Sequence, residues 1–84
     1  MASSTGHSPQ DHFAHCMQVF GGVTSASRRL GIDERALRRF VNGERPISSR
    51  LLEDTAKALR DLIAEATAAE AGLAEVLKAQ PKDQ

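Results

Sequence analysis

Arginine side chains are concentrated in one short segment of this chain of 84 residues. Residues 28–50 hold seven basic and three acidic side chains, a net charge of +4, whereas residues 1–27 carry −1 and residues 51–84 carry −3. The formal net charge of the whole chain is therefore zero. An arginine guanidinium donates paired hydrogen bonds to planar acceptors such as a phosphate or the edge of a guanine. The basic segment is where a polyanion would dock.

The spacing of these arginines predicts that several share the exposed side of a helix over residues 34–42. Leu37, Phe40 and Val41 fall on its inner face. The residues left outside are Glu34, Arg35, Arg38 and Arg39. Arginine can bond O6 and N7 of guanine, and glutamate can accept from N4 of cytosine, so this set suits a G·C-containing half-site. A charged face that only keeps a surface helix in water is the alternative.

A sharp turn precedes this helix. Gly31 can take the left-handed conformation that ends a helix, and Asp33 is a candidate N-cap for the next one. Ile32 and Leu37 are spaced as a hydrophobic staple, which fixes the angle at which the chain enters the second helix. The pattern predicts two short helices joined by a tight turn.

The first helix of this pair is expected over residues 24–30, with Thr24 as its N-cap. Its inner face is predicted to hold Val23, Ala26 and Leu30, and its outer face Ser25, Arg28 and Arg29.

The segment from Thr24 to Gly43 resembles the helix-turn-helix of the lambda-repressor-like, Cro/CI-type DNA-binding family. The resemblance covers about residues 13–62. It depends on the small residues Ala26 and Ser27 in the first helix and on Leu30, Gly31 and Ile32 at the turn. It also depends on the inward residues Leu37 and Phe40 of the second helix and on Asn42 and Gly43, which end that helix. The family prefers alanine where this chain has Ser27, and often has glutamine near Thr24.

The resemblance implies two groups of DNA contacts. The residues expected to contact base edges are Glu34, Arg35, Arg38 and Arg39. Those expected to contact phosphates are Thr24, Ser25, Arg28, Arg45 and Arg50. In the family the first helix of the pair crosses the backbone while the second lies in the major groove.

A helix that supports this pair is predicted to begin at Ser8 and Pro9, a cap followed by a proline. Its apolar face is formed at helical spacing by Phe13, Cys16, Met17 and Phe20. His12 and His15 with Cys16 have a spacing that metal ligands also use, but Cys16 shares its face with two phenylalanines, so we predict a buried thiol and no metal site. Residues 1–7 are small and polar and are predicted to form a disordered arm.

A long helix is predicted from Ser49, capped by Ser48, up to Pro81, interrupted in composition only by Gly72. Leu52, Thr55 and Leu59 begin a heptad seam. Its later part is the predicted dimer interface, formed by Leu62, Ala66, Ala69, Leu73 and Val76. We expect a DNA-binding domain over residues 8–62, a dimerisation helix over 63–79 and a polar tail over 80–84. A fold-back after Leu62 into a fifth helix is the alternative.

These patterns together predict an all-α protein: four helices in a lambda-repressor-like domain, extended at the C-terminus for dimerisation. The favoured function is a sequence-specific regulator of transcription, most simply a repressor, that binds double-stranded DNA as a homodimer on a palindromic operator. The alternative is a helical protein-interaction module, an adaptor or antitoxin-like partner, whose basic helix meets an acidic protein. We expect no catalytic residues and no cofactor or small-molecule ligand. We also expect no association with a membrane. The single cysteine favours the reducing cytoplasm, with the protein held at the nucleoid through DNA.

Overall fold

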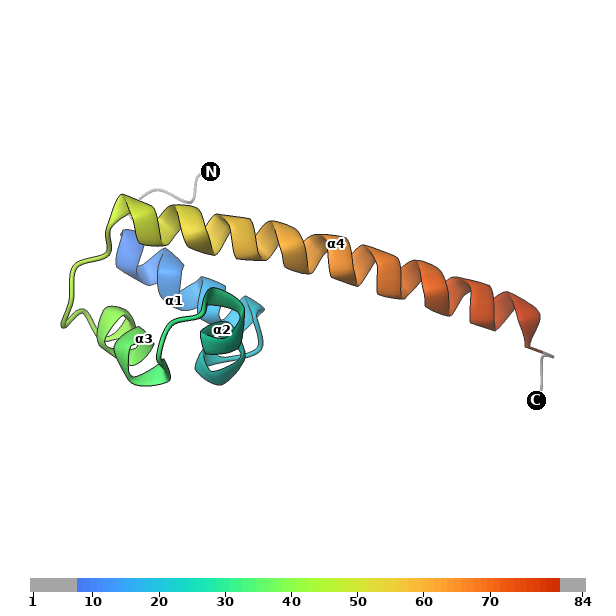
Figure 1. Cartoon of the computed structure of the whole chain (residues 1–84), viewed down its shortest axis with the longest axis horizontal. Coiled ribbons are helices and arrows are strands. Elements are labelled where there is room, and N and C mark those ends of the chain that lie inside the picture. The colour runs from blue at the N-terminus through green and yellow to red at the C-terminus, as the bar shows by residue number, and fades with distance from the viewer. Residues whose placement is uncertain (1–7, 81–84) are drawn as a thin grey trace.

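Four helices follow one another in the structure, a computed structural model that describes residues 8–80: α1 (Pro9–Val19), α2 (Val23–Leu30), α3 (Glu34–Val41) and α4 (Ser49–Ala79). None of the residues 8–80 lies in a strand, so the all-α prediction is confirmed. Figure 1 shows α1, α2 and α3 gathered beneath the first half of α4, whose second half extends beyond them. The predicted arm over residues 1–7, and the part of the predicted tail after Gln80, lie outside the described residues.

The core lies between α1, α2, α3 and the first half of α4. Phe13 and Leu37 are the largest of its fully buried side chains, and the rings of Phe13 and Phe40 meet edge to face at 6.2 Å. The remaining buried apolar residues are Cys16, Met17, Phe20, Ala26, Leu51 and Ala58. The predicted apolar face of α1 is therefore confirmed. Burial raises the pKa of the Cys16 thiol, because the charged thiolate would lose its hydration there.

The junction between α1 and α2 corrects one expectation. Gly21 and Gly22 both have positive φ, and the carbonyl of Gly22 accepts from the N–H of Ala26. Gly22 is thus the N-cap of α2, which begins at Val23, and it supplies no side chain to the cap. The prediction that Thr24 caps this helix was wrong, because the chain turns two residues earlier, at Gly22, and the Thr24 hydroxyl donates to Glu34 instead.

The turn between α2 and α3 is built as predicted. Gly31 ends α2 with φ of 68°, and the Asp33 carboxylate accepts from the N–H groups of Arg35 and Ala36. Ser27, where alanine is usual in the family that the sequence resembles, donates its hydroxyl to the carbonyl of Ile32 at 2.7 Å. This bond joins the last turn of α2 to the turn itself, which fixes the direction in which α3 leaves.

The end of α3 is tied to the start of α1. Asn42 caps the helix, and Gly43 follows with φ of 82°. The Gln10 side-chain amide donates to the carbonyl of Val41 at 3.0 Å and lies against Gly43 so closely that a Cβ there would come within 2.9 Å of Gln10 Nε2. Glycine suits this position because of its left-handed backbone, and a Cβ there would also displace the Gln10 amide.

Helix α4 is continuous. Its N-cap is Ser48, as predicted, and it ends at Ala79 with Gln80 extended, so there is no fold-back into a fifth helix after Leu62. The predicted start of the seam needs correction: Leu51 is 6% exposed and Leu52 is 36% exposed. The stripe that covers the core is therefore Leu51, Thr55 and Ala58, and the partly buried Leu59 and Leu62 also pack against the core.

Candidate nucleic-acid interface

The outer face of α3 carries three arginines side by side. At 100° per residue, Arg35, Arg38 and Arg39 fall within about 100° of one another on the helix surface. All three are exposed, while Leu37 on the other side is completely buried. Packing of the inner face and the Asp33 cap therefore hold the arginines on a rigid support.

Glu34 organises the first turn of this face. Its Oε2 atom accepts from the Thr24 hydroxyl at 2.8 Å and from Arg38 Nη2 at 2.8 Å. These donors, the threonine first, hold the pKa of Glu34 below its usual value, because they favour its charged form. Three of the residues predicted to contact DNA are thus brought together by the turn, although the sequence analysis gave Thr24 and Glu34 unrelated roles.

Arg35 and Arg39 differ from Arg38. Neither forms an ion pair within the part of the chain that the structure describes, whereas Arg38 is paired with Glu34. Their guanidinium groups have all their donors available to an anionic or planar acceptor. Arg35 is close to the start of the helix and Arg39 is one turn further on.

The predicted phosphate contacts are spread over three elements. Arg28 is exposed near the end of α2. Ser25 is partly buried near the start of α2, and its hydroxyl lies beside Gly21, 3.4 Å from the point where a Cβ on that glycine would stand. The Arg45 guanidinium lies 5.3 Å from the centre of the Phe40 ring, which holds it beside the end of α3. Arg50 lies in the first turn of α4 and pairs with Asp54 at 3.5 Å.

A contact that the sequence analysis missed joins α2 to α4. Arg29 donates through Nη2 to Glu65 Oε1 at 2.7 Å and through Nη1 to Glu65 Oε2 at 3.2 Å. This paired bond raises the pKa of Arg29 and lowers that of Glu65, since each charge favours the other. The residues are 36 positions apart, so no local spacing could have shown the pair.

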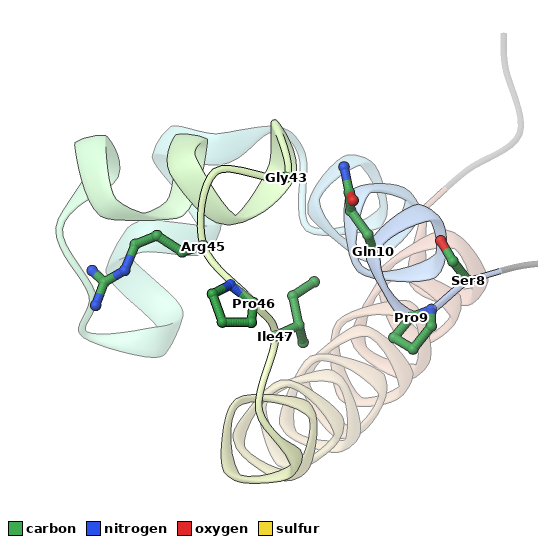
Figure 2. Close-up of a pocket in the computed structure, with 7 residues that line it drawn as sticks. All are labelled: Ser8, Pro9, Gln10, Gly43, Arg45, Pro46 and Ile47. Carbon is green, nitrogen blue, oxygen red and sulfur yellow. The ribbon is translucent and has the colours of Figure 1, made fainter.

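A depression of about 250 Å³ lies between the start of α1 and the loop after α3. Figure 2 shows its lining, which consists of Ser8, Pro9, Gln10, Gly43, Arg45, Pro46 and Ile47. Arg45 is the one charged side chain among these, so the depression brings no acid and base together. Within residues 8–80 no three His, Cys, Asp or Glu side chains are grouped as a metal site would require. None of the four helices has the length and apolarity of a membrane span.

The structure thus brings Thr24, Glu34 and Arg38 into one network and leaves Arg35 and Arg39 beside it. The assignment of these and the other predicted residues to bases or phosphates stays a prediction. No protein-family model matches the chain, and no curated protein or solved structure matches it either.

Proposed function

We propose that this protein is a sequence-specific regulator of transcription that binds double-stranded DNA with α3 in the major groove. The observation that carries the proposal is the outer face of α3, where Arg35, Arg38 and Arg39 stand together opposite a fully buried Leu37. A helix of this width fits the major groove, and arginine is the side chain most used to read guanine there. The α2–α3 pair then acts as the helix-turn-helix of a Cro/CI-type domain.

In this proposal the three arginines have different roles in DNA binding, because their contacts within the chain differ. Arg35 and Arg39 can turn all their donors toward base edges, while Arg38 is oriented by Glu34 and keeps its remaining donors for DNA. Glu34 Oε2 is already bonded to Thr24 and Arg38, so in this proposal its main contribution is to position Arg38. Arg28, Arg45 and Arg50 lie outside α3 and supply the phosphate contacts, which carry affinity without sequence information.

We further propose that a homodimer acts as a repressor by occupying a palindromic operator. Two depressions, of about 250 and 270 Å³, lie at the surface of the domain, below the range of about 300–1,000 Å³ that is usual for small-molecule pockets. In this proposal the protein is regulated by its own concentration. Two copies of α3 would occupy grooves separated by one helical turn of DNA, about 34 Å, or by a multiple of it.

The experiment that tests this proposal begins with selection of bound duplexes from a random library. Fluorescence anisotropy on the selected sequence and on a scrambled duplex, from about 50 to 200 mM salt, should show tighter binding of the selected sequence and a steep fall of affinity with salt, because neutralised phosphates release counterions. Arg35→Ala should reduce the preference, and Arg60→Ala, which removes an exposed arginine of α4, is the matched control.

Failure to enrich any duplex would overturn the proposal. It would favour the alternative of a protein-interaction module whose basic face binds an acidic protein surface. In that case binding to an acidic partner protein should depend on the same α3 arginines. If it does, the proposal named the right surface but the wrong partner; if it does not, the surface itself was wrong.

A further inference from the structure

The stripe of α4 that covers the core continues beyond it. Leu62 is the last of the apolar residues packed against the core, and the same stripe then runs on at alternating spacings of four and three through Ala66, Ala69, Leu73 and Val76. Beyond the core, the large apolar side chains Ile63, Leu73, Val76 and Leu77 are between 51% and 69% exposed. Figure 1 shows this half of α4 extending away from the other helices.

We infer that this face binds the same face of a second copy in the antiparallel direction, with the two-fold axis at the level of Ala71. The inference deepens the proposed homodimer and does not depend on its binding to DNA. Three properties of the described helix favour this one arrangement over a parallel pair: the sizes of the seam residues, the residues that flank the seam, and the place where the helix ends.

The sizes of the seam residues are complementary only in the antiparallel direction. With the axis at Ala71, residues whose numbers sum to 142 face each other, so Ala66 meets the partner's Val76 and Ala69 meets the partner's Leu73. Each layer then contains one small and one large side chain and fills evenly. A parallel pair would place alanine against alanine in two layers, and then leucine against leucine and valine against valine in the next two. The alanine layers would need the helices closer together than the other layers allow.

The flanking residues give the same answer. Ile63 and Leu77 are the two most exposed large apolar residues among residues 8–80, and they lie on the same side of the seam. On this side of the seam, flanking positions face each other where their numbers sum to 140, two less than in the seam itself. In the antiparallel pair Ile63 therefore meets the partner's Leu77, and this happens twice. In a parallel pair the flanking positions five residues apart face each other, which would set Glu65 against the partner's Glu70 twice. The antiparallel pair has one such like-charge contact, between Glu70 and the partner's Glu70.

The length of α4 also fits. The partner's Gln80, where the helix has ended, falls opposite Leu62, where the contact with the core ends. The partner's helix would therefore stop as it reaches the three-helix part of the first chain. Gly72 lies beside the axis, and a Cβ on it would meet nothing within 4 Å in its own chain. A glycine at the centre lets two helices with alanine in their seam approach closely.

This arrangement has a consequence for the proposed DNA binding. The start of α4 lies 22 residues from the axis, so the starts of the two α4 helices would be about 66 Å apart at ~1.5 Å per residue. Figure 1 shows α3 at this end of the molecule. Two turns of B-form DNA span about 68 Å. Among the multiples of one turn, the antiparallel dimer favours half-sites two turns apart.

Disulfide trapping tests the direction without DNA. In a Cys16→Ala background, Ala66→Cys, Val76→Cys and the double variant are oxidised in a glutathione buffer. In the antiparallel pair residue 66 lies about 15 Å along the axis from its own copy but directly opposite residue 76. The double variant should be trapped as a dimer almost completely, and each single variant at least tenfold less. Light scattering of the reduced proteins shows whether each variant still dimerises.

Trapping of the single variants as efficiently as the double variant would overturn the antiparallel direction, and no trapping of a double variant that remains dimeric would overturn this face. Spin labels on Lys78→Cys and on Ala71→Cys, both away from the seam, give a second measurement. The Lys78 labels should be about 21 Å further apart along the axis than the Ala71 labels. Equal separations would contradict the inference. Loss of DNA binding with these results intact would count against the proposed function alone.

Discussion

The outer face of α3 and the second half of α4 are both exposed helical surfaces, but opposite residue types cover them. On α3 the exposed side chains are arginines, and the helix is only eight residues long, held by burial of Leu37, by the Asp33 cap and by Gln10. The second half of α4 exposes leucine, isoleucine and valine and is held by its own backbone hydrogen bonds and by Arg29 through Glu65. The first surface suits a charged partner. The second exposes apolar area to water, which is unfavourable until another apolar surface covers it.

The difference also concerns stability. A short helix such as α3 is marginal alone and depends on tertiary packing, which the core supplies within one chain. Among the described residues, the second half of α4 has no such packing apart from the contact of Glu65 with Arg29. We expect it to be stabilised by a second copy, so its stability should depend on protein concentration.

The largest expected effect comes from placing a charge in the seam. Leu73→Glu removes the burial of two leucines from each dimer, worth about 1.5–3 kcal/mol each, so the dimer dissociation constant should rise on the order of 100-fold or more. Sedimentation equilibrium measures this. Ala71→Glu adds the same charge on the opposite side of α4 and should leave the constant nearly unchanged. A similar loss in both variants would mean that charge, and not burial of Leu73, weakens the dimer.

Removal of single arginines should separate base contacts from phosphate contacts. Arg35→Ala or Arg38→Ala should cost about 1–3 kcal/mol on the selected operator, with a smaller loss on random DNA. Arg28→Ala and Arg50→Ala should weaken binding to every sequence alike and lower the salt slope by about one unit each. Anisotropy titrations over a salt series measure both quantities. Equal losses on operator and random DNA for all four variants would contradict base readout by α3.

A smaller effect is expected where α3 is joined to α1. Gly43→Ala should lower the free energy of unfolding by about 1–2 kcal/mol, because alanine is strained at φ of 82° and its Cβ would displace Gln10. Gly31→Ala is the control, since its φ is also left-handed but a Cβ there meets nothing within 4 Å. Chemical denaturation of both variants should show the larger loss for Gly43. A loss as large at Gly31 would show that the contact with Gln10 is unimportant.

The smallest effect concerns pH. Arg29 lowers the folded-state pKa of Glu65 from its ordinary 4.5, so the stabilisation is complete above that value and is lost as the pH falls through the folded pKa. Glu65→Gln should flatten the fall in melting temperature between about pH 5 and 3. Glu53→Gln, an exposed residue of α4 without an ion pair in the described part of the chain, is the control. An unchanged acid limb in Glu65→Gln would show that the pair adds nothing to stability in solution.

Several features of the fold followed from the sequence because their causes are local. The apolar face of α1 follows from apolar residues repeated every three or four positions. The left-handed Gly31, the Asp33 cap and the Ser48 cap each depend on residues within four positions of one another. The continuity of α4 is also local, since no residue between its cap and Pro81 breaks a helix. The exposure of the α3 arginines followed from the burial of Leu37 on the opposite side of the same helix.

Other features were decided by the tertiary structure. Thr24 was expected to cap α2, yet its hydroxyl meets Glu34 because the turn brings the start of α2 beside the start of α3. Arg29 faces outward as expected, and the angle between α2 and α4 also places its guanidinium on Glu65, which the sequence did not predict. The choice of Leu51 over Leu52 for the core depends on how far α4 is rotated about its own axis. Periodicity gives the apolar stripe only to within about one residue, whereas the rotation and crossing angle of a helix are set by the side chains it packs against, which lie far away in the sequence.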